Sequence, residues 1–454
     1  MRHAPPNGVS AHRAPDQAVL CDQYREMPYW WLAAPPEQAA HAPLDVAGTV
    51  DVAIVGGGVT GSVAALQLAR HGVSVTVFDK DGLGEGAARR NAGFLGRTLK
   101  RSLSWLEAHH GVEYAAAVYR ELDEARAGLA DLVRAEGIDC QLQQCGRVIC
   151  ANSDAHQREL VDDLRYLKSR LGFPYEVLDR GDLQREIASG VYVGGALVPD
   201  LGSIHPGLYH QGLVRAARAA GVRYLPGVEV RRIENRGRLK HLRTTAGEVT
   251  AEQVIVATNG YTAKDLVWFA RRIIPFRGFI VTTEELPPAL IGKVLPRRRT
   301  YLDTRLNIDF IRPAPDSERI IFGGRTGSSA RSARDLAGRL HATLVRILPD
   351  LAGAKLSFGW TGYCAGTFDF MPHIGQHDGL HFAMGYNFAG LPVGTHFGIK
   401  LARRILSQQD SRSVFDRAPF PSHPLYRGCA GGSPWFVPLA MRFFDWRDAR
   451  MARG

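Results

Sequence analysis

Apolar positions near residue 50 follow the order of a buried strand, a tight turn and a helix. A short apolar run at 52–55 is followed by three glycines at 56–58, and residues 61–70 carry apolar side chains at helical spacing before Gly72. A second apolar run ends at Asp79. This order predicts a β-α-β unit that opens a parallel sheet.

The rest of the chain alternates between helical and strand-like stretches. Apolar spacing predicts mostly helix over 105–190, interrupted by a short strand at 146–151, and alternation over 273–325 predicts an antiparallel sheet. Further expected elements are a helix at 208–220, a strand at 253–257, a helix near 331–348 and a helix at 394–406. Residues 1–45 are rich in Pro, Ala and His and are expected to be loosely ordered, except that Tyr29-Trp30-Trp31 docks on a domain surface.

Composition excludes several classes of protein. The chain of 454 residues is 45% hydrophobic and 22% charged, as in ordinary globular proteins. No segment predicts a signal peptide or a transmembrane helix. The six cysteines show neither CxxC pairing nor a histidine at ligand spacing. We therefore predict no metal site, no disulfide framework and a cytoplasmic location.

The net charge of +11 permits attraction to phosphates, acidic lipids or acidic substrates. The cations are mostly arginines scattered along the chain, and their longest run is Arg297-Arg298-Arg299. No zinc-finger or aromatic-and-basic RNA-binding signature accompanies them. We interpret the charge as compositional and expect no nucleic-acid partner.

The glycines at 56–61 form a G-x-G-x-x-G motif between the predicted strand and helix. Gly56 permits the tight turn, Gly58 lets the backbone approach a pyrophosphate, and Gly61 lets helix and strand pack closely. The amide end of the helix then faces the phosphate charge. The alternative is a glycine-rich turn of an α/β protein without a nucleotide. Strand, helix and the acidic residue at 79 together favour dinucleotide binding.

Asp79 ends the second strand at the spacing where a carboxylate holds ribose hydroxyls and repels a 2′-phosphate. The motif lies near the start of a long chain whose nucleotide-binding strands resume much later. A small-residue loop at 84–93 follows and is suited to run along an extended cofactor. These features favour FAD over NAD.

Several separated motifs resemble the glycine/D-amino-acid oxidase family of FAD enzymes, and within it the gamma-glutamylputrescine oxidoreductase branch. The resemblance runs from Tyr29 to the C-terminal helix. The motifs are the loop at 84–93, Gly202-Ser203-Ile204-His205-Pro206, the stretch QVIVATNGY at 253–261, Trp360-Thr361-Gly362 followed by 369–375, and the loop at 385–391.

The resemblance implies non-covalent FAD and a set of cofactor contacts. These are Gly56, Gly57, Gly58, Thr60, Gly61, Asp79, Lys80, Gly86, Ala88, Asn91, Ala92, Gly93, Val230, Ala257, Gly260, Gly390 and Leu391. Val230 is expected to meet the adenine edge through its backbone. Gly390 is expected near the isoalloxazine at a helix N-terminus, where the helix dipole stabilises negative charge on the reduced ring.

The chain departs from the family pattern at three places. In the loop at 385–391, Phe388 stands where the family has glycine and Ala389 where it has histidine. Sarcosine-type members carry a lysine that assists oxygen reduction, and the corresponding stretch here, 319–322, has none. Cys364 lies two residues out of register with the cysteine that tethers FAD in some relatives.

Four residues are candidates for the chemistry. His205 precedes a helix, where it either tunes amine protonation or caps the helix. Arg312 and Arg325 either grip a substrate carboxylate or carry surface charge. Tyr386 either walls the pocket against the flavin or is core. The stretch 435–446 has apolar residues at helical spacing and is expected to dock or to join the core rather than to anchor in a membrane.

The predicted fold is α/β, with a Rossmann-like FAD-binding domain interleaved with an α+β substrate domain that contains an antiparallel sheet. We assign 46–105, 191–262 and 355–410 to the FAD-binding domain, 106–190 and 263–354 to the substrate domain, 1–45 to an N-terminal extension and 411–454 to a C-terminal docking segment.

The predicted function is oxidation of the CH–NH bond of an amine or amino acid, such as a gamma-glutamylated polyamine, by hydride transfer to flavin N5. Oxygen or another acceptor then takes the electrons. Alternatives that stay open are a dehydrogenase with a quinone or protein acceptor and a flavin-binding protein without turnover. A nucleic-acid-modifying flavoprotein rests on charge alone.

Overall fold

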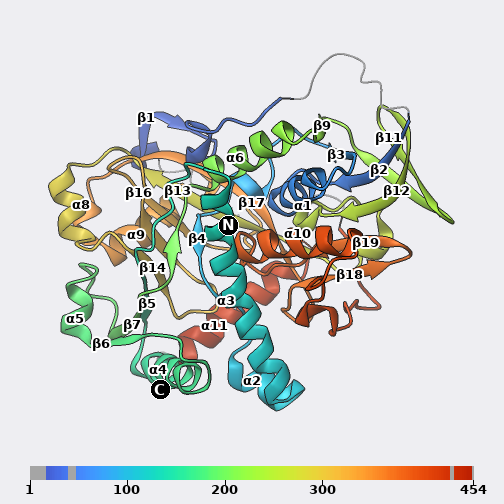
Figure 1. The fold of residues 1–454 in the computed structure, drawn as a ribbon. Coiled ribbons are helices and arrows are strands. Elements are labelled where there is room, and N and C mark those ends of the chain that lie inside the picture. Colours follow the sequence, from blue (N-terminus) through green and yellow to red (C-terminus); the bar gives the residue numbers. More distant parts are fainter. Residues whose placement is uncertain (1–16, 39–47, 430–433, 452–454) are drawn as a thin grey trace, which may run out of the picture.

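The computed structural model describes residues 17–38, 48–429 and 434–451, and its strands form two large sheets (Figure 1). The eight-stranded sheet has the order β10-β11-β12-β2-β3-β9, with β19 beside β12 and β18 beside β19. Its strands are β2 (Thr49–Val55), β3 (Val75–Asp79), β9 (Arg223–Pro226), β10 (Val230–Arg236), β11 (Leu239–Thr244), β12 (Gly247–Val256), β18 (His373–His377) and β19 (Leu380–Met384).

The centre of this sheet is parallel, as the β-α-β pattern predicted. β2 pairs in parallel with both β3 and β12, and β19 extends the parallel array beside β12. Helix α1 (Val59–Arg70) begins two residues earlier than expected and packs against α6 (Pro206–Ala219) and α10 (Pro392–Ile405). The strands expected at 52–55, up to Asp79 and at 253–257 thus lie in one sheet, together with β19.

The nine-stranded sheet is mixed rather than purely antiparallel, with the order β1-β17-β13-β16-β15-β14-β5-β7-β6. β13 pairs antiparallel with β16 and β17, whereas β1 with β17 and β5 with β14 are parallel. Its strands are β1 (Leu20–Arg25), β5 (Arg147–Ala151), β6 (Glu176–Leu178), β7 (Gly194–Val198), β13 (Ile274–Thr283), β14 (Thr300–Asp303), β15 (Phe310–Pro313), β16 (Ile320–Gly324) and β17 (Leu356–Gly366).

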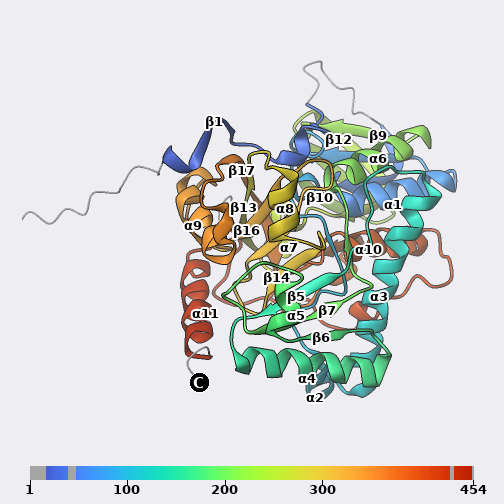
Figure 2. The same cartoon turned by 90° about the vertical axis from the view of Figure 1, so that its left-hand side faces the viewer.

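Helices cover the outer faces of both sheets (Figure 2). Long α3 (Val112–Ala135) packs against α10 and against α2 (Leu103–His110). The other helices are α4 (Asp154–Leu171), α5 (Arg180–Gln184), α7 (Val267–Ala270), α8 (Pro288–Val294), α9 (Ala337–Ile347) and α11 (Val437–Met451). A short pair of strands, β4 (Phe94–Leu95) and β8 (Gly202–Ser203), ties the loop after 84–93 to the chain before α6.

Two strands belong to a different sheet from the one implied by our domain boundaries. β7 and β17 fall in segments assigned to the FAD-binding domain, yet both pair in the nine-stranded sheet. β7 is buried along its whole length. Periodicity identifies such a strand but does not say which sheet it joins. The division of the chain into two domains stays a prediction.

The N-terminal segment is more ordered than composition suggested, and this corrects our expectation for its described part. β1 forms the edge of the nine-stranded sheet beside β17. Trp30 is fully buried, and its indole nitrogen donates to the carbonyl oxygen of Asn91 at 2.8 Å. The expected docking of the aromatic group is confirmed, whereas residues 1–16 and 39–45 lie outside the described ranges.

The C-terminal segment forms α11, as the apolar spacing at 435–446 indicated. In the part of the chain that the structure describes, no helix has the length and apolar character needed to cross a membrane.

Candidate active site

A cavity of about 720 Å³ is lined by residues from both sheets and, on one side, by α11. Its volume lies within the range of ligand pockets. The carboxyl ends of β2, β3 and β12 contribute to its wall, which is where open α/β sheets bind nucleotides.

Most of the residues predicted to contact a cofactor line this cavity. They are Gly56, Gly57, Gly58, Thr60, Asp79, Lys80, Gly86, Ala88, Asn91, Ala92, Gly93, Val230, Ala257, Gly390 and Leu391, and the predicted pocket residue Tyr386 lies with them. Gly61 and Gly260 lie behind the wall. A side chain at Gly260 would sit 2.8 Å from the carbonyl oxygen of Cys364, so this glycine allows the chain to pass close to β17.

The three motif glycines differ in what surrounds them. Gly56 has a φ of +107°, which a glycine adopts readily and other residues rarely. A Cβ on Gly61 would lie 2.0 Å from the carbonyl oxygen of Gly56, so α1 packs closely on the turn. A Cβ on Gly58 would meet nothing within 4 Å. Gly58 therefore presents bare backbone to the cavity, as a phosphate cradle requires.

Asp79 holds the turn from the end of β3. Its Oδ2 accepts a hydrogen bond from the amide of Gly57 at 2.9 Å, and its Oδ1 accepts one from the amide of Asp81 at 3.2 Å. Burial raises the pKa of this carboxyl to about 6, against the opposing effect of those two amides. The carboxyl retains acceptor capacity for hydroxyl groups in the cavity.

A buried relay that sequence reasoning missed supports the same turn. His210 on α6 places Nε2 at 2.7 Å from the carbonyl oxygen of Gly57, and its Nδ1 accepts from Nε of Arg89 at 3.0 Å. Arg89 also donates to the carbonyl oxygens of Ala34 and Pro35. Burial lowers the pKa of His210 to about 3, so its ring is neutral. The relay joins the phosphate turn to the loop at 84–93.

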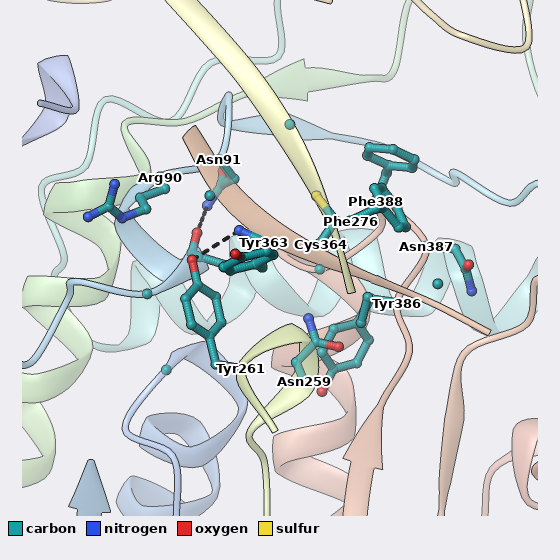
Figure 3. Close-up of a pocket in the computed structure, with 18 of the residues that line it drawn as sticks. Arg90, Asn91, Asn259, Tyr261, Phe276, Tyr363, Cys364, Tyr386, Asn387 and Phe388 are labelled. Atoms are coloured by element: carbon teal, nitrogen blue, oxygen red, sulfur yellow. Dashed lines mark hydrogen bonds between the residues drawn. The ribbon is translucent and has the colours of Figure 1, made fainter. Parts of the chain in front are cut away.

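The loop at 84–93 is fixed by its own side chains. The Asn91 amide donates to the carbonyl oxygens of Ala87 and Ala88 at 3.0 Å, and its Oδ1 accepts from the amide of Gly93 at 2.8 Å (Figure 3). A Cβ on Gly93 would lie 2.2 Å from the carbonyl oxygen of Ile204, where φ is +75°. Only glycine suits that close passage.

These residues fit a flavin dinucleotide. Bare backbone at Gly58, the amide end of α1 and the acceptor at Asp79 supply sites for a pyrophosphate and a ribose. Gly390 and Leu391 bring the amide end of α10 to the cavity, because α10 begins at Pro392. Two helix N-termini therefore face the cavity: that of α1 is suited to a pyrophosphate, and that of α10 is suited to negative charge on a ring.

Tyr261, Tyr363 and Tyr386 line the cavity (Figure 3). The hydroxyl oxygens of Tyr386 and Thr60 are 2.6 Å apart, and the Tyr386 hydroxyl also donates to the carbonyl oxygen of Ala383. Tyr261 accepts from the amide of Tyr363 at 3.1 Å. Cys364 follows on β17, and burial raises the pKa of its thiol to about 12, so the sulfur is protonated.

Two consecutive residues before α10 have a left-handed backbone. Asn387 has φ of +45° and Phe388 has φ of +80°, a conformation that is costly for residues with a side chain. Asn387 is held by hydrogen bonds from its amide to Thr367 Oγ1 and to the carbonyl oxygen of Gly385. The Phe388 ring lies in the cavity wall beside Phe276, with centroids 5.3 Å apart. Phe388, which stands where the family has glycine, thus has a strained backbone and faces the cavity.

Lys100 is a cation of the cavity wall that was not among the candidate residues from the sequence. Its Nζ lies 5.0 Å from the centroid of the Phe388 ring, and it lines the cavity. Among the described residues no carboxylate forms an ion pair with it and no acceptor takes a hydrogen bond from it. Burial lowers the pKa of Lys100 to about 8, so the ammonium form prevails at neutral pH.

Charge is divided along the cavity. The carboxylates in its wall are Asp79, Asp81 and Glu229, all near the ends of β3 and β10. The remaining wall is largely apolar and aromatic, and its charged groups are the cations Arg90, Lys100, Arg101, Arg147 and Arg447. A ligand group bound there meets positive charge without a compensating carboxylate from the wall.

His205 and Arg312 lie away from the cavity, which corrects the roles we expected for them. His205 is completely buried and caps α6, accepting at Nδ1 from the amide of Leu208 at 3.1 Å. Burial lowers its pKa to about 4, so it lacks the near-neutral pKa that amine protonation needs. Arg312 is buried as well, and its guanidinium donates to the carbonyl oxygens of Ala92, Gly93, Ile204 and Pro313.

Arg325 does not join Arg312. In the ladder of β15 and β16, Arg312 pairs with Ile321, whereas Arg325 follows the far end of β16. Arg325 is exposed and borders a separate polar pocket with Arg346 and Asp309. The pair therefore does not form a fork in the main cavity. Arg312 instead holds the loop at 84–93 and the turn before α6 together.

Comparison with known proteins agrees with this geometry. A family described as FAD dependent oxidoreductase, abbreviated DAO, matches residues 51–404. The chain is 29% identical to gamma-glutamylputrescine oxidoreductase of Escherichia coli over 415 residues, covering 90% of this chain and 96% of that protein. It is 27% identical to a probable oxidoreductase, OrdL, of Rhizobium meliloti over 423 residues, covering 93% and 96%.

Among solved structures, the crystal structure of glycine oxidase from Geobacillus kaustophilus superposes with a TM-score of 0.68 at 25% identity. The match covers 83% of this chain and 99% of that one. The phosphate turn, the two large sheets and the family match over most of the chain lead to one conclusion: this chain belongs to the DAO family of FAD-dependent oxidoreductases.

Proposed function

We propose that this oxidoreductase oxidises the CH–NH bond of an amine that also carries a carboxylate, such as a gamma-glutamylated diamine or an amino acid. The observation that carries the proposal is Lys100, a largely desolvated and unpaired cation in the apolar, aromatic part of the cavity. A substrate carboxylate there would gain a charge-assisted hydrogen bond at little cost, because the lysine has already lost most of its water.

The bound cofactor supplies the hydride acceptor for this chemistry. The turn at 56–58, Asp79 and the loop at 84–93 would hold its dinucleotide part, and Gly390 and Leu391 would place the amide end of α10 at its ring. Phe276, Tyr363 and Phe388 would exclude water from the amine, which favours the neutral form that can be oxidised. This reaction requires no side chain that removes a proton from the carbon or donates one to it.

A free diamine is the informative competitor. A diamine has a second ammonium group instead of a carboxylate, and that group would meet Lys100, Arg101 and Arg147. The carboxylates that act on these cations, Asp303, Asp448 and Asp369, do not line the cavity. Like charges in a partly desolvated site repel. The cavity therefore favours N-acylated diamines that carry a carboxylate, which agrees with the compound that the name of the Escherichia coli relative contains.

The test is a set of matched substrates assayed with an artificial dye as acceptor. A gamma-glutamylated diamine should show kcat/KM at least about tenfold above that of the free diamine, as expected for one charge-assisted contact. Lys100→Gln should remove most of this preference, and Lys355→Gln, at an exposed lysine outside the cavity, should retain it. Equal kcat/KM for both substrates in the unaltered enzyme would contradict the proposal.

We also place the enzyme in the cytoplasm, a proposal supported by its six cysteines, none of which forms a disulfide.

A further inference from the structure

Helix α11 has two different apolar faces. One face lines the cavity with Val437, Met441 and Phe444. The other exposes Leu439, Phe443 and Trp446, whose exposed fractions are 53%, 55% and 54%. These positions recur at i, i+4 and i+7 and so share one side of the helix. A helix that only closed the cavity would need no apolar residues on that second side.

The charges of α11 are also divided between its faces. Asp448 accepts from the backbone amide of Leu306 at 2.9 Å, and Asp445 accepts from the side-chain amide of Asn307 at 3.2 Å. Both carboxylates are therefore engaged with the loop that follows β14. Arg442 and Arg450 are exposed and flank the apolar side chains of the second face, where the Arg450 guanidinium lies 5.4 Å from the Trp446 ring centroid.

We propose that the outer face of α11, formed by Leu439, Arg442, Phe443, Trp446 and Arg450, docks on an anionic lipid surface. Apolar and aromatic side chains bracketed by arginines match the boundary between acyl chains and negatively charged headgroups. A second copy of this chain fits less well, because the face carries no free carboxylate and each chain has a net charge of +11.

Docking through the outer face of α11 would affect the enzyme because the same helix lines the cavity. In Figure 2, α11 lies at one edge of the molecule, next to the C-terminus. Because its inner face walls the cavity, lipid contact would bear directly on the helix that bounds the substrate space. Docking of this kind depends neither on the identity of the substrate nor on the proposed reaction.

The test is co-sedimentation of the FAD-loaded full chain with vesicles. We expect binding to vesicles of phosphatidylcholine with about one third phosphatidylglycerol, weak binding to phosphatidylcholine alone, and loss of binding in high salt. Phe443→Ser with Trp446→Ser should lower the partition coefficient more than about tenfold, because two large side chains lose their burial in the interface. Arg442→Gln with Arg450→Gln should remove the preference for anionic vesicles.

Val112→Ser, at an equally exposed apolar residue on α3, is the matched control and should bind like the unaltered chain. Retained FAD and an unchanged melting temperature show that each variant is folded. Equal sedimentation with and without anionic vesicles would overturn the proposal, as would equal binding by all variants. Concentration-dependent self-association that Phe443→Ser with Trp446→Ser abolishes would instead assign the face to a second copy of the chain.

Discussion

His210 Nε2 lies 2.7 Å from the carbonyl oxygen of Gly57, inside the glycine turn at 56–58. Because Nδ1 of the same ring accepts from Arg89, the Nε2 must carry the proton and donate to Gly57. The tautomer is thus set by its neighbours. One buried imidazole fixes the glycine turn at 56–58 against the loop at 84–93.

We predict that His210→Leu weakens FAD binding about tenfold or more and lowers the melting temperature. The substitution removes the Nε2 donor from the carbonyl oxygen of Gly57, which keeps only the hydroxyl of Ser62 at 3.2 Å, and it leaves Nε of Arg89 without an acceptor. Each lost buried hydrogen bond costs about 1–3 kcal/mol. Fluorescence titration of the apoprotein with FAD measures the change. His241→Leu, on β11 away from the cavity, should leave FAD affinity unaltered, and an equal loss in both variants would contradict this role of His210.

Asp79 predicts how FAD affinity depends on pH. Its pKa is raised to about 6 by burial, so the free protein protonates it below that pH. Ribose hydroxyls need the ionised form as acceptor, so affinity is retained above pH 6 and is lost as the pH falls through 6, by up to about tenfold per unit. Asp79→Asn should bind FAD more weakly at pH 8 and with no step near pH 6. A step of the same size in that variant would assign the effect to another group.

Lys100 predicts the opposite dependence for carboxylate ligands. Its pKa is lowered to about 8 by burial, so the cation is present below pH 8 and is lost as the pH rises through that value. The Kd of propionate, followed through the flavin spectrum, should therefore rise above pH 8. Lys100→Gln should bind propionate weakly at every pH. Binding that strengthens above pH 8 would indicate that the neutral amine acts as a base instead.

Phe388 is strained by a φ of +80°, and two substitutions separate strain from packing. Phe388→Ala and Phe388→Gly both remove the contacts with Phe276 and Lys100. Only glycine relieves the left-handed strain, so Phe388→Gly should be more stable than Phe388→Ala by about 1 kcal/mol. Urea denaturation compares the two. Equal stability would show that the backbone relaxes when the ring is removed.

Most of the predicted cofactor contacts line one cavity because their requirements are local. Gly56, Gly58 and Asp79 act through backbone conformation and spacing within one β-α-β unit, and such features are visible in a short window. The strand ends that surround them follow from the parallel sheet. Within this β-α-β unit the structure differs from the prediction at the start of α1, by two residues.

The substrate half depends on contacts between distant segments. Lys100 meets Phe388 across 288 positions, and nothing near Lys100 in the sequence distinguishes it from a surface lysine. Arg312 was a candidate carboxylate ligand, yet its guanidinium donates to three backbone carbonyl oxygens from other segments and to that of the neighbouring Pro313. The position of an arginine in the sequence does not reveal whether its hydrogen bonds hold the fold together or remain available to a ligand.

An anaerobic titration of the FAD-loaded protein with a gamma-glutamylated diamine tests the central claim most directly. We predict that absorbance of the oxidised flavin disappears in proportion to added amine until one equivalent per flavin has reacted, because each CH–NH bond yields two electrons. Flavin that stays oxidised with this compound and with amino acids, in protein that retains its FAD, would contradict it.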